Sequence, residues 1–128
     1  MRWDALRTVV ALLAITAWVS INEFVRNQVV LPGPWAEHYA GLGLEFPAAP
    51  VNGAIWGLWA LLFAIAVVWL ARRHPLWSTG LTAWWVGFAL MWVVIGNLGV
   101  LPIGILPVAV PWSLVEAFGA AWIAHRLK

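Results

Sequence analysis

The sequence predicts an all-α, polytopic membrane protein, a single domain formed by a four-transmembrane-helix bundle. Of its 128 residues, 64% are apolar and only 9% are charged, whereas charged residues make up about a quarter of a soluble domain. The mean hydropathy of +0.90 points the same way. Four apolar runs are long enough to cross a bilayer, and most of the charged residues lie beside them. The lipid bilayer is therefore the first expected partner.

The first helix is expected over residues 5–30, which is long enough to cross with some tilt. Arg2 and Arg7 before an apolar run suggest a signal peptide, but no small-x-small cleavage site follows. Polar residues recur at helical spacing and form one stripe, which we expect to face other helices: Thr16, Ser20, Glu23 and Asn27.

Residues 31–52 are rich in proline and glycine and predict a roughly 20-residue exoplasmic loop between the first two spans. Pro34 can start a short helix in which Trp35, Tyr39 and Leu42 share a face. Such a helix would lie in the membrane interface as a lid or plug. An ordered loop with aromatic anchors is the favoured alternative.

The second and third helices are expected over residues 53–71 and 77–95, joined by a link so short that they should be antiparallel neighbours. Each carries a face of small residues that permits close helix approach. These faces are Gly53, Gly57, Ala60 and Ala64 in one helix, and Gly80, Ala83 and Gly87 in the other. Together these two faces offer more small-residue surface than one contact within the chain needs. We therefore expect a homo-oligomer or a partner membrane subunit.

The fourth helix is expected over residues 101–125 and contains three prolines, Pro102, Pro107 and Pro111. Proline is tolerated in membrane helices when neighbouring groups satisfy the freed carbonyls. This span is therefore either kinked or begins only near Pro111 after a re-entrant approach. In both cases Glu116 lies on a small, partly polar face that should point into the bundle.

The distribution of positive charge predicts the orientation. One side of the four-span arrangement receives Arg2, Arg7, Arg72, Arg73, Arg126 and Lys128, and the other receives only Arg26. By the positive-inside rule both termini are cytoplasmic, in the cell membrane. The long connection with Glu37, His38 and Glu45 is then exoplasmic.

A candidate polar centre consists of the ionisable residues placed deepest in the membrane, with two asparagines near helix ends: Glu23, Arg26, Glu116, Asn22 and Asn97. Glu23 and Arg26 are three residues apart and can pair on one helix. Glu116 has no countercharge within four residues. It is either unpaired and protonated, or paired with Arg26 across the bundle.

Three functions are compatible with this centre. A structural or accessory subunit, or a bundle that binds a small ligand, is the leading interpretation. The alternatives are proton-coupled transport of a small solute, and an enzyme that uses Glu23 and Glu116 as acid and base on a lipid or isoprenoid. Two acids without a nucleophile or metal spacing are a weak catalytic signal, so a non-enzyme is favoured.

The many tryptophans bear on the ligand. Trp3, Trp35, Trp77 and Trp112 flank apolar runs as interface anchors do, and Trp59, Trp84, Trp85 and Trp92 lie deeper. The deeper group could line a flat apolar ligand such as a quinone, carotenoid or sterol. Ordinary packing and lipid contact explain it more simply.

Other site classes lack a signal in the sequence. There is no cysteine, and His38, His74 and His125 do not have the spacing that places two metal ligands on one helix face. The glycines form neither a phosphate loop nor a dinucleotide fingerprint. We therefore expect no metal, no cofactor and, without a basic stripe, no nucleic acid as a partner.

Overall fold

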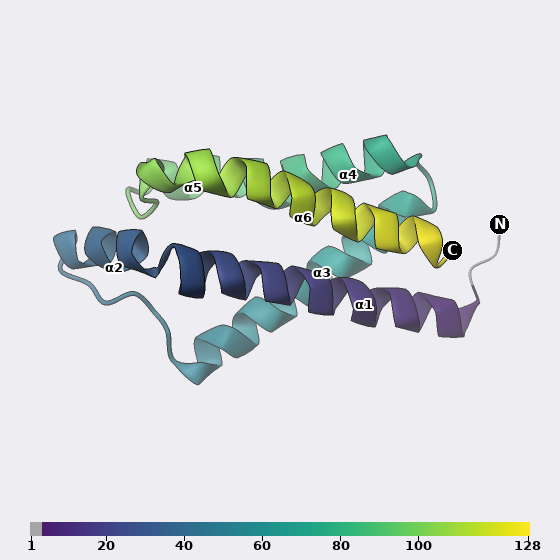
Figure 1. Cartoon of the computed structure of the whole chain (residues 1–128), viewed down its shortest axis with the longest axis horizontal. Helices are drawn as coiled ribbons and strands as arrows, with labels where there is room; N and C mark the ends of the chain where they lie inside the picture. The colour runs from purple at the N-terminus through teal and green to yellow at the C-terminus, as the bar shows by residue number, and fades with distance from the viewer. Residues whose placement is uncertain (1–3) are drawn as a thin grey trace.

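The computed structural model describes residues 4–128, and that part of the chain contains helices and no strand (Figure 1). The expectations for Arg2 and Trp3 lie outside the described residues. Asp4 caps the first helix, because its side chain accepts a hydrogen bond from the backbone N–H of Arg7 at 2.7 Å.

The described residues contain four helical segments that are long and apolar enough to cross a membrane. The first is α1 (Ala5–Phe24) continued by the π-helical η1 (Val25–Val30), and the second is α3 (Pro50–Ala71). The third joins α4 (Leu76–Trp84), the π-helical η2 (Trp85–Ala89) and α5 (Leu90–Asn97). The fourth is η3 (Ile103–Ile105) followed by α6 (Leu106–Arg126). The four-helix membrane bundle is confirmed.

The connection between the first two spans differs from the favoured expectation of a loop. Its first half is a helix, α2 (Pro32–Gly41), which begins two residues before Pro34. Pro32 suits this position, because the first residue of a helix donates no intrahelical hydrogen bond. Trp35 and Tyr39 of α2 pack on Phe46 of the following segment, with ring centroids 5.4 and 5.2 Å apart. These ring contacts hold the short helix against the chain that follows it.

The fourth span is continuous, so a start near Pro111 is wrong. The helix α6 begins at Leu106 after one 3₁₀ turn and runs through Pro111. Pro107 lies in the first turn, where its missing N–H removes no hydrogen bond. The extra helical turn before Pro111 extends α6 toward the end of the bundle where α2 lies (Figure 1).

The bundle interior is built mainly from small residues, with large apolar side chains outside. Alanines from all four spans are buried, whereas many Leu, Val, Ile and Trp side chains are exposed. This is the pattern expected where lipid covers the outside and close backbone approach holds the helices together. Gly80 lies against the Phe118 ring and Gly87 against Phe63, while Gly53 and Gly57 face open space.

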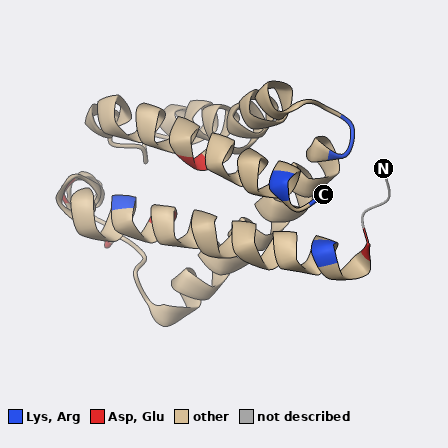
Figure 2. Cartoon of the chain, turned by 45° about the vertical axis from the view of Figure 1, so that its right-hand side comes forward, with Lys and Arg blue, Asp and Glu red and all other residues tan. Residues whose placement is uncertain are grey.

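The helix ends near the termini are tied together. Arg72 Nη2 donates to Thr8 Oγ1 at 3.0 Å, which joins α3 to α1. Lys128 Nζ donates to the carbonyl oxygen of Ala71 at 3.2 Å, which brings the end of the chain to the same place. Most of the Lys and Arg residues gather at this end, where the start of α1 and the C-terminus lie (Figure 2).

Candidate functional site

Arg26 stands between two carboxylates at the opposite end of the bundle. Its Nη1 donates to Oε2 of Glu116 at 2.7 Å, and its Nη2 donates to Oε1 of Glu23. The Arg26 side chain is 4% exposed, Glu23 is 16% exposed and Glu116 is completely buried. Glu116 is therefore paired across the bundle, and the three residues form one charged cluster, called the triad below.

Neighbouring groups fix the triad in place. Asn27 Nδ2 donates to Oε2 of Glu23 at 3.1 Å. The ring of buried Phe88 lies under the Arg26 guanidinium, 5.8 Å from its Cζ to the ring centroid. Trp18 Nε1 donates to the backbone carbonyl of Glu116 at 2.9 Å and so joins α1 to α6 beside the pair. Side chains and backbone from three of the spans thus hold the charged groups in register.

Both π-helical segments border the triad. The segment η1 carries Arg26 and Asn27, and η2 carries Phe88. A π turn adds one residue to a helical turn and changes the direction of the side chains that follow. The widened turn is visible in the hydrogen bond from Leu31 N to the carbonyl oxygen of Arg26, at 2.9 Å. Such turns are frequent at functional sites, which supports a role for this centre.

The triad holds two acids and one base. With all three groups ionised it carries one excess negative charge. The helices α3, α4 and α5 and the segment η2 contain no ionisable residue that could balance it. Oε1 of Glu116 is buried and has no hydrogen-bond partner among the described residues. An unbalanced charge in a low-dielectric interior is costly, so the centre favours an additional positive charge.

A cavity of about 350 Å³ adjoins the triad. Glu23, Arg26 and Asn27 form its polar wall, and the rest of the lining is mostly apolar. Of the described residues, six aromatic side chains line it: Trp35, Tyr39, Phe46, Trp56, Trp59 and Trp92. A concave apolar pocket with a few converging polar groups is the usual form of a small-molecule site, and its volume lies in the range of such sites.

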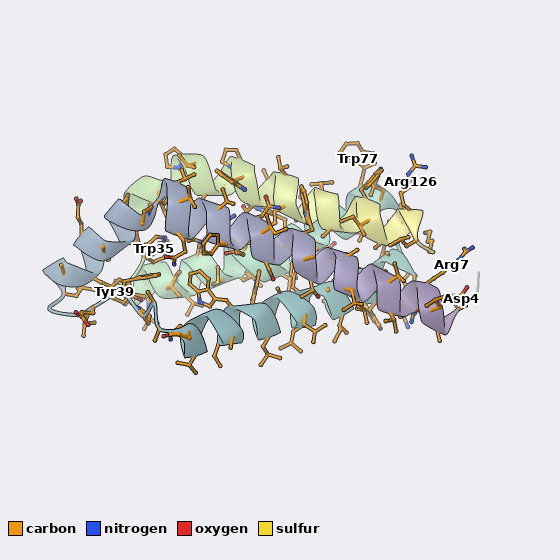
Figure 3. All side chains as sticks on the ribbon, turned by 60° about the horizontal axis from the view of Figure 1, so that its bottom comes forward. Asp4, Arg7, Trp35, Tyr39, Trp77 and Arg126 are labelled. Carbon is orange, nitrogen blue, oxygen red and sulfur yellow. The ribbon has the colours of Figure 1, made fainter. Side chains whose placement is uncertain are left out.

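The helix α2 forms the roof of this cavity. Trp35 Nε1 donates to Oδ1 of Asn27 at 3.0 Å, which joins the roof to the polar wall. His38 Nε2 donates to the carbonyl oxygen of Gly99 at 2.7 Å, which joins it to the turn after α5. Figure 3 shows Trp35 and Tyr39 at this end of the molecule, far from Asp4, Arg7 and Arg126. The lid suggested by the sequence thus has a matching element in the structure.

The structure brings together three of the five residues expected in the polar centre: Glu23, Arg26 and Glu116. Asn22 faces elsewhere, because its Oδ1 accepts a hydrogen bond from Trp112 Nε1 at 3.0 Å. Asn97 is exposed at the end of α5. Neither asparagine lines the cavity. Their position near helix ends did not determine the direction of their side chains.

The deeper tryptophans separate into two groups. Trp59 and Trp92 line the cavity. Trp84 instead donates to Oγ of Ser113 at 2.9 Å, and Trp85 is largely exposed. Trp35, expected as an interface anchor, belongs to the cavity wall as well. The deeper tryptophans are therefore divided between the cavity lining and positions outside it.

Asn27 and Phe88 are parts of the centre that the sequence did not single out as site residues. Asn27 had a usable signal, because it lies four residues after Glu23 on the polar stripe. Phe88 had no such signal in the sequence, since its place under Arg26 depends on how α4 and η2 pack. Among residues 4–128, no group of three His, Asp or Glu side chains gathers as metal ligands.

Comparison with known proteins adds no relative to this description: no family model, no curated protein and no solved structure matches the chain.

Proposed function

We propose that this membrane protein binds a small, largely apolar molecule in the aromatic cavity beneath α2, with the polar end of that molecule directed at Glu23 and Arg26. The observation that carries the proposal is the cavity itself. Its volume is about 350 Å³, and its charged groups, Glu23 and Arg26, lie on only one wall. Apolar walls supply affinity and the few polar groups set the orientation of the ligand.

The alternative functions explain fewer of the observed features. A purely structural role accounts for the ion pairs between helices but not for a cavity beside them. A membrane enzyme needs a group positioned to attack or to transfer a proton to substrate, and the carboxylates here are already engaged by Arg26 and Asn27. Transport remains compatible with ligand binding, since a transporter also has a binding site.

The test measures binding of 1-naphthylmethanol, a neutral two-ring molecule with one polar end. The purified protein in phosphatidylcholine nanodiscs is compared with empty nanodiscs by equilibrium dialysis. We expect saturable binding of one molecule per chain above the lipid background. Ile55→Trp should abolish it, because Ile55 lines the cavity and is 57% exposed, so a larger ring has room to fill the site.

Ile65→Trp is the matched control. It makes the same substitution in the same helix at a position that is 47% exposed and lies outside the cavity lining. Its binding should equal that of the unmodified chain. Equal uptake by protein-containing and empty nanodiscs, or equal loss in both variants, would contradict a site in this cavity.

A further inference from the structure

The charge of the triad points to the class of ligand. We propose that the cavity takes a monovalent organic cation with an aromatic or apolar body, and that this cation and a proton compete for the same excess negative charge. The inference rests on the proposed function, because it assumes that the cavity is a binding site. It goes further by assigning the ligand's charge and by linking its binding to protons.

The first argument is the balance of charge at the polar wall. Arg26 is a full positive charge, but Glu116 and Glu23 both bind it, on Nη1 and Nη2. An anionic ligand would therefore meet a guanidinium that is already neutralised and a second carboxylate that repels it. A cation meets the excess negative charge, and the low-dielectric surroundings strengthen that attraction.

The second argument is the chemistry of the remaining walls. Trp35, Trp56, Trp59 and Trp92, with Tyr39 and Phe46, present aromatic rings to the cavity. The faces of such rings attract cations, most strongly those of Trp, and desolvated aromatic cages are the usual receptors for quaternary ammonium groups. An inorganic cation would need several oxygen ligands, whereas the only side-chain oxygens in the described lining are those of Glu23, Asn27 and Tyr39.

The third argument concerns the state without ligand. Glu116 is completely buried and its Oε1 has no hydrogen-bond partner among the described residues. The groups that face it are Arg26 and Glu23, from the first span, and the third span contributes the uncharged ring of Phe88 beneath Arg26. A proton on one of the two carboxyls cancels the excess charge. An arriving cation performs the same neutralisation, so that proton is released when the cation binds.

The experiment compares two probes of the same shape. Trimethyl(1-naphthylmethyl)ammonium carries a permanent charge, and 1-neopentylnaphthalene has carbon in place of its nitrogen. Dialysis against zwitterionic phosphatidylcholine nanodiscs measures both, with empty nanodiscs subtracted. At pH 8 we expect the cation to bind at least about tenfold more tightly than its neutral analogue. Its affinity should rise with pH, by up to about tenfold per unit, while that of the neutral analogue stays constant.

Two variants test whether the triad is responsible. Glu116→Gln removes the excess charge without altering a residue of the cavity wall, so the affinity ratio of cation to neutral analogue should fall toward one and lose its pH dependence. Glu23→Gln should give the same change and serves if Glu116→Gln does not fold. Glu37→Gln is the matched control, since it removes an exposed carboxylate on α2 and should leave the ratio unchanged.

The outcomes separate the two proposals. Equal affinity for both probes, with saturable binding, overturns the cation assignment and leaves the binding site intact. A preference for the cation that is independent of pH, or that persists in both Gln variants, overturns the role of the triad. If neither probe nor 1-naphthylmethanol binds above the lipid background, the proposed function fails as well.

Discussion

Arg26 has two carboxylate partners, and this makes the effects of substitution at the triad unequal. Arg26→Gln leaves Glu23 and Glu116 facing each other without a cation, and breaking a buried pair in this way costs about 3–5 kcal/mol. Glu116→Gln instead leaves Arg26 with one partner, Glu23, and the cluster becomes neutral. We expect it to change the free energy of unfolding by about 1 kcal/mol or less.

The measurement is unfolding of the purified variants in mild detergent. The double variant Arg26→Gln/Glu116→Gln should be more stable than Arg26→Gln alone, because it removes one of the two opposed acids. Arg73→Gln, at an exposed arginine near the other end, is the control and should cost about 1 kcal/mol or less. Equal losses for Glu116→Gln and Arg26→Gln would show that Arg26 depends on Glu116 alone.

At the same residue scale, the sequence supplied the members of the triad and one of its two pairs, and left the pair between Arg26 and Glu116 as one of two alternatives. Glu23 and Arg26 could be paired from their spacing on one helix. The contact between Arg26 and Glu116 spans 90 positions in the chain. It depends on how the first and fourth spans pack and on the π turn at η1, and hydrophobic periodicity indicates neither of them.

At the scale of helices, the third span packs through its glycines. A Cβ added at Gly80 would stand 2.5 Å from the Phe118 ring, so Gly80→Ala must displace that ring. Overpacking of this kind costs about 1–3 kcal/mol. Gly57→Ala is the matched change, because nothing lies within 4 Å of the new methyl group and alanine is the better helix former. We expect it to be neutral or stabilising.

Thermal unfolding of both variants in the same detergent tests this difference. The prediction is wrong if Gly80→Ala is as stable as the unmodified chain. It is also wrong if Gly57→Ala loses as much stability as Gly80→Ala, since that would indicate a partner helix against Gly57.

The roof helix α2 depends on few contacts. None of its residues is buried. Two hydrogen bonds hold it, one from Trp35 to Asn27 and one from His38 to the backbone carbonyl of Gly99. We expect His38→Ala to loosen the outer end of α2, with amide exchange there faster by about tenfold, which corresponds to loss of one hydrogen bond. Hydrogen exchange with mass spectrometry measures this directly.

Glu37→Ala is the control for the roof, because Glu37 is the exposed neighbour of His38 on the same helix. Its exchange should match that of the unmodified chain, as should exchange in α3 and α6 in both variants. Unchanged exchange of α2 in His38→Ala would show that the hydrogen bond from Trp35 to Asn27 and the aromatic contacts with Phe46 hold the roof without His38.

The positions of the helices show which parts of the fold can be predicted from the amino-acid composition. The spans were predictable to within a few residues because lipid imposes length and apolarity on each of them. The helix α2 was less predictable, since it lies outside the apolar runs and relies on ring contacts with Phe46. The π segments were not predictable, because nothing in the composition or the hydrophobic periodicity distinguishes them from the α-helices that they interrupt or continue.

At the scale of the whole molecule, two expectations stay predictions: orientation and self-association. The small-residue faces of the second and third spans differ in what covers them. Those of Gly80 and Gly87 are filled by Phe118 and Phe63, whereas Gly53 and Gly57 face open space in a Gly-x-x-x-Gly spacing. If the protein associates with a second membrane helix, that part of α3 permits a close approach.

The orientation prediction uses the separation of charge between the two ends. Arg7, Arg72, Arg73, Arg126 and Lys128 lie at or next to the helix ends that are farthest from α2, and Arg26 lies in η1, directly before α2. Arg26 is neutralised by its two partners, so it contributes little to the positive-inside bias. The bias therefore predicts that both termini are cytoplasmic and that the cavity lies in the outer half of the bilayer. Ligands would then enter from the exoplasmic side.

Reporter fusions decide this orientation. A fusion at Arg73 and a fusion at Lys128 should both report the cytoplasm, whereas one inserted after Gly41, at the end of α2, should report the exoplasmic side. Replacing both Arg72 and Arg73 with Glu removes two of the cytoplasmic cations and should yield a mixed population. An exoplasmic report from Lys128 in the unmodified chain would reverse the orientation, and the cavity would then open toward the cytoplasm with the triad unchanged.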